Sequence, residues 1–105
     1  MKLKLSIKER LSIIPLFPES GSFDTLIIKK DIIDKISIKQ KDIEKHNIKE
    51  VNGSIAWNLT DDGDIQEFEL TELETNHIKL LFTKLNNEEK LNENVLEVYK
   101  QLFVK

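Results

Sequence analysis

Few residues of this chain have side chains suited to catalysis or metal binding, and their spacing favours neither. The chain contains two histidines, His46 and His77, and no Cys. Without Cys there is no thiol nucleophile, no disulfide and no Cys-type zinc site. Neither histidine lies in an HxxE, HExxH or HxH pattern, so a zinc ion or a general base would lack its usual partners. We expect His46 at a helix end and His77 on a helix face shared with Leu73 and Leu81.

Two other short segments could bind a ligand or supply a nucleophile. The sequence DDGD, Asp61–Asp64, places three carboxylates around Gly63, but a calcium loop needs alternating oxygen ligands over about twelve residues and a final bidentate Glu. Glu72 lies near that distance but beyond a predicted strand, so we expect an acidic turn. Ser20–Ser22 lacks the nucleophile-elbow pattern. With three Gly in the chain there is no phosphate-binding loop either. We therefore predict no enzymatic activity, no cofactor and no metal site.

Length and charge limit the remaining classes of function. A chain of 105 residues, 39% of them hydrophobic, fits one domain over residues 1–105. The first residues contain no signal peptide and no long apolar run, so we expect a cytoplasmic protein with no membrane contact. Net charge is -3, but the cations concentrate in residues 1–50 and the carboxylates in residues 51–105. The acidic half would repel a phosphate backbone, which makes nucleic acid a disfavoured partner.

Capping signals and apolar spacing predict three helices in the N-terminal half, over about residues 7–14, 22–36 and 38–46. Their expected caps are Ser6 with Glu9, Ser22 or Asp24, and Ser37 with Gln40. Pro15 should end the first helix, and Asn47 suits the left-handed conformation that ends the third. Before them, alternating Leu3, Leu5 and Ile7 predict a short strand or an extended lead-in.

Two turn signals, Asn52-Gly53 and Asp62-Gly63, predict a three-stranded antiparallel meander. Its strands would be the segments before the first turn, between the two turns and after the second turn. The two registers agree, because Ile48 falls opposite Trp57 and Trp57 falls opposite Phe68. One face of the sheet would then be apolar and the other wet. The expected apolar face consists of Ile48, Ile55, Trp57, Leu59, Phe68 and Leu70. The expected wet face consists of Lys49, Ser54, Asn58, Glu67 and Glu69.

Two further helices should follow the sheet. Thr71 with Glu74 forms a capping box for the first, whose expected apolar face is Leu73, Leu80, Leu81 and Leu85, with Ile78 and Phe82 beside it. Asn92 can cap the second, which should run to about Val104. This last helix has two apolar stripes, the first being Leu91, Val95, Val98 and Leu102, and the second Leu96, Tyr99 and Phe103. The fold class is therefore α+β: three N-terminal helices, a three-stranded meander and a C-terminal helical hairpin.

A last helix with two apolar stripes needs two partners, of which one can be the preceding helix and the other the sheet or a second chain. With no catalytic constellation in the sequence, this predicts a protein-interaction role with self-association as one form. The expected partner-binding residues are Leu96, Tyr99 and Phe103, together with Glu67 and Glu69 on the wet face of the sheet.

A winged-helix DNA-binding protein is the alternative, because two short helices followed by a hairpin is the order of that fold. The helix over residues 38–46 would then present phosphate-binding and base-reading side chains to DNA, with one cation beside the wing. These residues are Lys39, Gln40, Lys41, Lys45 and Lys49. Asp42 and Glu44 interrupt the positive surface, which counts against this interpretation.

Four segments carry a resemblance to a group of known proteins. IKERLSIIPLFPESGSF (residues 7–23), DIEKHNIKE (residues 42–50), Trp57 and LEVYKQLF (residues 96–103) resemble short bacteriophage and prophage proteins of unknown function. The resemblance brings no catalytic residue with it. It implies a small accessory protein in the host cell cytoplasm that binds or inhibits a host factor, or that forms part of an assembly.

Overall fold

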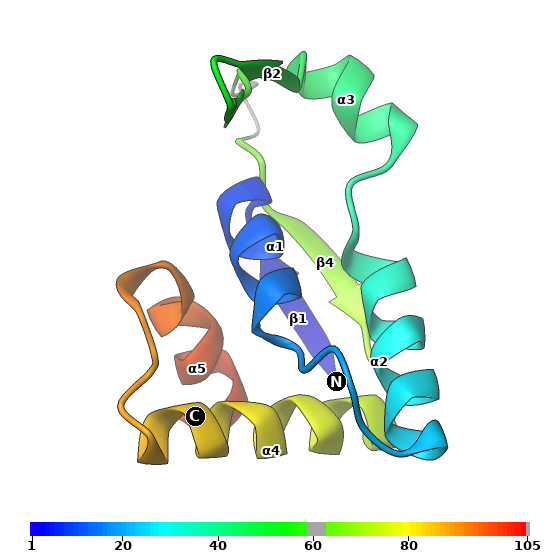
Figure 1. The fold of residues 1–105 in the computed structure, drawn as a ribbon. Helices are drawn as coiled ribbons and strands as arrows, with labels where there is room; N and C mark the ends of the chain where they lie inside the picture. The colour runs from blue at the N-terminus through cyan, green and yellow to red at the C-terminus, as the bar shows by residue number, and fades with distance from the viewer. Residues whose placement is uncertain (59–62, 105) are drawn as a thin grey trace.

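The protein has an α+β fold with two small antiparallel sheets, and helices lie against and around the β1–β4 sheet (Figure 1). The structure, a computed structural model, describes residues 1–58 and 63–104. In chain order the elements are β1 (Lys2–Leu5), α1 (Ile7–Ile13), η1 (Ile14–Leu16), α2 (Phe23–Ile36), α3 (Gln40–His46), β2 (Lys49–Val51), β3 (Ser54–Ala56), β4 (Gln66–Glu69), α4 (Glu72–Asn87), η2 (Glu93–Val95) and α5 (Leu96–Phe103). The predicted α+β class is confirmed, and α1, α2 and α3 lie within the three N-terminal ranges expected to be helical, but the predicted arrangement of the strands is not found.

The predicted caps account for most helix starts. The Ser6–Glu9 and Thr71–Glu74 capping boxes are both formed, and the Ser22 hydroxyl accepts the Thr25 N–H. The start of α3 differs from the prediction, because the carboxylate of Asp42 accepts the Lys39 N–H at 2.9 Å and Ser37 with Gln40 makes no box. Asn47 ends α3 in the left-handed conformation, with φ 50°.

The prediction of a three-stranded meander is wrong. β4 pairs with β1, so that Leu3 lies opposite Phe68, while β2 and β3 form a separate hairpin. That hairpin has the predicted register, with Glu50 opposite Ile55 and positive φ at Asn52 and Gly53, as a type I′ turn requires. β1 is the better partner for β4, because Leu3 and Leu5 are both fully buried against it. The predicted second turn falls partly on residues outside those described.

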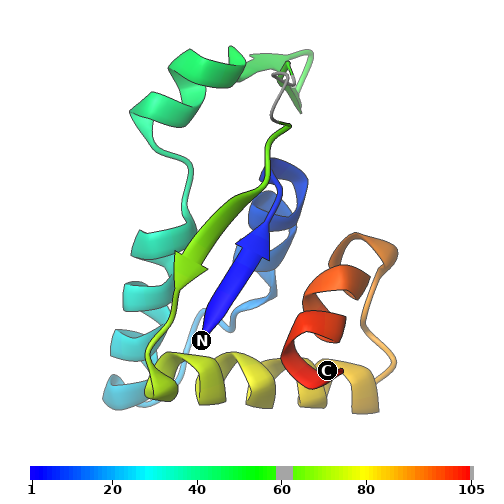
Figure 2. The same cartoon turned by 180° about the vertical axis from the view of Figure 1, so that it is seen from behind.

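The core lies between the β1–β4 sheet and the helices α1, α2, α4 and α5. Both views show α4 running across one end of the molecule, and α3 with the β2–β3 hairpin at the opposite end (Figures 1 and 2). The core cluster consists of Leu3, Leu5, Ile13, Phe17, Ile32, Ile36, Phe68, Leu70, Ile78, Phe82, Leu85, Val95, Val98 and Leu102. α3, β2 and β3 contribute none of these side chains, so they form a lobe that extends from the body.

Two predicted apolar faces are placed differently by the structure. Phe68 and Leu70 are buried as expected, but Ile55 is 49% exposed and Ile48 and Trp57 are half-buried, because their hairpin stands apart from the core. Leu59 lies outside the described residues. On α4 the buried face is centred on Ile78 and Phe82, whereas Leu73 and Leu80 point to solvent. The predicted apolar face of α4 is rotated about the helix axis relative to the buried face. The reason is that the prediction left out Glu74 and Thr75, which are buried on the inner side.

A buried ion pair joins the lobe to the body. Arg10 of α1 is 1% exposed, and its guanidinium donates to the carbonyls of Ile36 and Ser37, both at 2.7 Å, and to the carboxylate of Asp42 at 3.0 Å. Its Cζ also lies 5.0 Å from the centre of the Phe68 ring. The Arg10 side chain therefore contacts the end of α2, the start of α3 and strand β4.

Asp42→Ala should lower the free energy of unfolding by about 3–5 kcal/mol, because it leaves the buried Arg10 charge without its counterion. Urea denaturation measures the change. Asp34→Ala is the matched control, because the Lys30–Asp34 pair is exposed and its loss should cost less than about 1 kcal/mol. Equal effects of the two substitutions would contradict the role given to Arg10 and Asp42.

Candidate functional site

The candidate interaction surface is the outer side of α5. Val98 and Leu102 anchor this helix in the core, and the Tyr99 and Phe103 rings contact each other with centroids 4.6 Å apart. Tyr99 packs partly against the core, whereas Leu96 and Phe103 remain 47% and 39% exposed. Val104, which follows the helix, is also exposed. The two apolar stripes predicted for this helix are therefore present, one buried and one largely open.

Gln101 fixes α5 against the sheet in a way that the sequence did not predict. Its side-chain amide accepts the Lys4 N–H and donates to the Lys4 C=O, both at 2.8 Å. The amide thus makes the two hydrogen bonds that a neighbouring strand would make with Lys4. A single Gln on an amphipathic helix has no signal that identifies such a contact, because the two residues are 97 positions apart in the chain.

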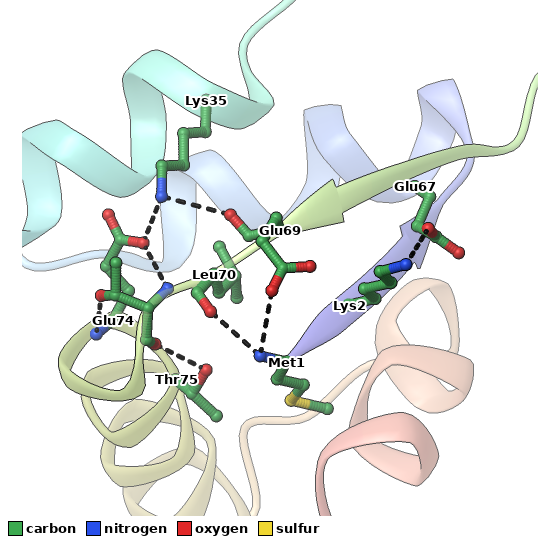
Figure 3. A network of polar contacts seen from close by, with 9 residues as sticks. Met1, Lys2, Lys35, Glu67, Glu69, Leu70, Glu74 and Thr75 are labelled. Atoms are coloured by element: carbon green, nitrogen blue, oxygen red, sulfur yellow. Dashed lines mark hydrogen bonds and ion pairs between the residues drawn. The ribbon is translucent and has the colours of Figure 1, made fainter.

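The other predicted partner-binding residues, Glu67 and Glu69, lie on β4 and have cationic neighbours at Lys2 and Met1. Glu67 lies 3.6 Å from the Lys2 ammonium, and Glu69 lies 3.8 Å from the amino group of Met1 (Figure 3). Glu67 lines a groove of about 530 Å³ together with Glu97 and Gln101 of α5, whereas Glu69 does not line it. Leu96, Tyr99 and Phe103 do not line that groove, so the structure does not join the two predicted sets into one surface.

A second polar cluster connects α2 to the start of α4 (Figure 3). The Lys35 ammonium lies 2.5 Å from the Glu74 carboxylate and 3.2 Å from the Glu69 carbonyl. The same carboxylate accepts the Thr71 N–H at 2.9 Å. Glu74 therefore does two things at once: it caps α4, as its position in the sequence predicted, and it binds the helix packed against α4, which no local pattern reveals.

Both buried carboxylates have a lowered pKa. Burial by itself raises the pKa of Asp42, but hydrogen bonds from Arg10 and the Lys39 N–H, with the charges of Arg10 and Lys41, outweigh it. Burial likewise raises the pKa of Glu74, and the hydrogen bonds and charge of Lys35, with the bonds from Thr71, outweigh it. Both groups are therefore anions in the folded protein at neutral pH.

These shifts predict a loss of stability in acid. A carboxyl group with a folded pKa below its unfolded pKa stabilises the fold above the unfolded value, and that stabilisation is lost as pH falls through the folded pKa. The free energy of unfolding should therefore be flat above about pH 5 and fall below about pH 4. Urea titrations at several pH values measure it. Glu74→Gln should make the acid limb shallower, and an unchanged slope would contradict the assignment.

The predicted nucleic-acid residues are spread over α3 and its neighbours. Lys39 turns its ammonium back to the Ser37 hydroxyl at 2.8 Å and to the Asp34 carbonyl, and the Gln40 amide approaches Glu44 at 3.5 Å. Lys41 and Lys45 line a pocket of about 270 Å³ that also contains the carboxylates of Asp42 and Asp64. Lys49 lies on β2. The set does not form an uninterrupted cationic face.

The residues considered for catalysis or metal binding have structural contacts. His46 is buried with its Nδ1 2.9 Å from the Asn58 carbonyl oxygen, and the ring of His77 stacks on Phe17 with centroids 6.1 Å apart. Ser22 caps α2, and the Asp64 carboxylate accepts the Ile7 N–H at 3.1 Å. Within residues 1–58 and 63–104, no three His, Asp or Glu side chains are grouped to hold a metal ion.

In the part of the chain that the structure describes, no helix has the length and apolar character needed to cross a bilayer. Comparison with protein-family models, with curated proteins and with solved structures found no match to this chain.

Proposed function

We propose that this protein acts without catalysis, as a protein-interaction module whose contact surface is the α5 strip, defined as Leu96, Tyr99, Phe103 and Val104. The observation that carries the proposal is the exposure of Leu96 and Phe103 on a helix whose other face is fully anchored in the core. The partner we propose is another protein with an apolar groove or helix face. A host factor that is bound or inhibited, or a component of an assembly, fits this role in a phage-type accessory protein.

Rigidity supports this choice of surface. Val98 and Leu102 hold the helix from inside, and Gln101 holds it to β1, so little backbone order has to be gained when a partner binds. The Tyr99–Phe103 pair adds an aromatic anchor of the kind that often dominates the binding energy of an interface. Glu97 and Lys100, paired with each other at 3.2 Å, supply a polar rim.

Leu96→Asp should abolish binding while leaving the fold intact, because a charge would be desolvated at the centre of the contact. Leu80→Asp is the matched control, since Leu80 is a more exposed Leu on the outer face of α4. Sedimentation velocity over a range of concentrations tests for self-association, and capture from a lysate tests for a foreign partner. A complex kept by Leu80→Asp and lost by Leu96→Asp supports the α5 strip. A single-chain mass at high concentration, with no capture sensitive to Leu96→Asp, would contradict it.

The DNA-binding alternative keeps one supporting observation, the order α1, α2, α3 and a β2–β3 hairpin. The pairing of β4 with β1 removes the three-stranded sheet that a winged helix would use, and Asp42 and Asp64 lie beside Lys41 and Lys45. We therefore expect a labelled random duplex to show no salt-sensitive anisotropy change between about 50 and 200 mM salt. Tight binding at the lower salt that weakens steeply at the higher, and is reduced by Lys41→Gln, would instead support the DNA-binding function.

A further inference from the structure

The two edges of the β1–β4 sheet differ in how many of their outward-facing backbone groups have hydrogen-bond partners. Met1 and Leu70 exchange two backbone hydrogen bonds, of 2.8 and 3.0 Å. Because bonded pairs alternate along an antiparallel ladder, Phe68 and Gln66 also direct their backbone groups to β1. Glu67 and Glu69 must then direct theirs to the opposite edge of β4. On the β1 edge, the corresponding groups of Lys4 are both bonded by Gln101.

The outer edge of β4 is covered only in part. The Glu69 carbonyl accepts the Lys35 ammonium at 3.2 Å, but the Glu69 N–H and both backbone groups of Glu67 have no partner within residues 1–58 and 63–104. An edge with free donors and acceptors is a template for another strand, and natural proteins usually cover it. The backbone groups of Glu67 and the Glu69 N–H are therefore available to an added strand.

A groove of about 310 Å³ runs along this edge, between residues 66–69 and the junction of α2 with α3. Four cationic and two anionic side chains line it. Arg10 and Lys35 pair with Asp42 and Glu74, whereas Glu67 pairs with Lys2. Glu69 pairs with the Met1 amino group. Lys39 and Lys41 form no ion pair with any described residue, although the Lys39 ammonium bonds the Ser37 hydroxyl and the Asp34 carbonyl, so the surplus charge of the groove is positive.

The surplus cations lie on one face of the sheet. Arg10 contacts the ring of Phe68 and the carboxylate of Asp42, which places the start of α3 on the Phe68 face. Glu67 and Glu69 occupy the other face, beside Lys2 and Met1. The side chains of an added strand would alternate between the two faces of the sheet. On the Phe68 face they would meet cations, and on the other face they would meet the carboxylates of Glu67 and Glu69.

We propose that the β4 edge groove binds an extended acidic segment of a partner protein as an added strand, with Asp or Glu at alternate positions and small polar residues between them. The backbone of the segment would bond to Glu67 and Glu69, and its carboxylates would face Lys39 and Lys41. A second copy of this chain is a poor occupant through β4, because antiparallel β4–β4 pairing sets Glu67 and Glu69 against their own counterparts. The site does not involve α5, so it is independent of the α5 strip.

The direct test is fluorescence anisotropy with a labelled, end-capped peptide of alternating Thr and Glu. We expect a dissociation constant below about 1 mM that weakens with salt. Lys41→Glu should weaken binding by about fivefold or more, since Lys41 is exposed and the reversal turns attraction into repulsion. Lys84→Glu on α4 is the matched control and should change little. Leu96→Asp should leave this binding unchanged, which separates the result from that of the α5 strip.

Backbone N-methylation of the peptide distinguishes strand addition from simple charge attraction. Methyl groups on the amides that face β4 should weaken binding by about tenfold, and methyl groups on the other amides should not. The Glu67 amide signal in an NMR titration should move on binding. No binding at millimolar peptide would overturn the proposal, as would affinity unaffected by methylation. A control peptide carries the same Thr and Glu residues, with all Thr in one half and all Glu in the other. Equal binding of this control would also overturn the proposal. So would displacement of the alternating peptide by duplex DNA, because that would indicate a shared cationic surface.

Discussion

The structure depends most on the burial of the Arg10 guanidinium. A charge that is 1% exposed is tolerated only when counterions and acceptors surround it, and this requirement fixes three segments at once. The carbonyls at the end of α2 and the carboxylate of Asp42 must both reach Arg10, so the chain has to turn between α2 and α3 where it does. Asp42 also bonds the Lys39 N–H and so sets the start of α3.

That arrangement has consequences for the surfaces. It brings Lys39 and Lys41 beside the outer edge of β4 and keeps α3 with its hairpin out of the core. At the other edge of the same sheet, Gln101 closes β1 and holds α5 so that one of its stripes is buried and the other open. The two proposed contact surfaces are therefore on different sides of one two-stranded sheet. They would serve partners of different chemistry, one apolar and one acidic.

The features that the sequence predicted correctly depend on local patterns. Caps such as Ser6 with Glu9 and Thr71 with Glu74, the Asn52-Gly53 turn, and the stripes of the last helix all depend on residues within a few positions of each other. The β1–β4 pairing joins residues more than sixty positions apart, and two locally consistent turn registers suggested a nearer but wrong partner for β4. The Gln101–Lys4 and Arg10–Asp42 contacts depend on tertiary placement in the same way, so patterning could not reveal them.

The claim that one ion pair attaches the lobe to the body is tested most directly by hydrogen exchange at individual amides. The experiment compares the wild-type chain with Asp42→Asn, which keeps the size of the side chain and removes its charge. We predict that amides in α3, β2 and β3 lose protection, while those of β1, β4 and α4 keep most of theirs. Loss of protection to the same extent throughout the chain, or no loss in α3, would contradict the account.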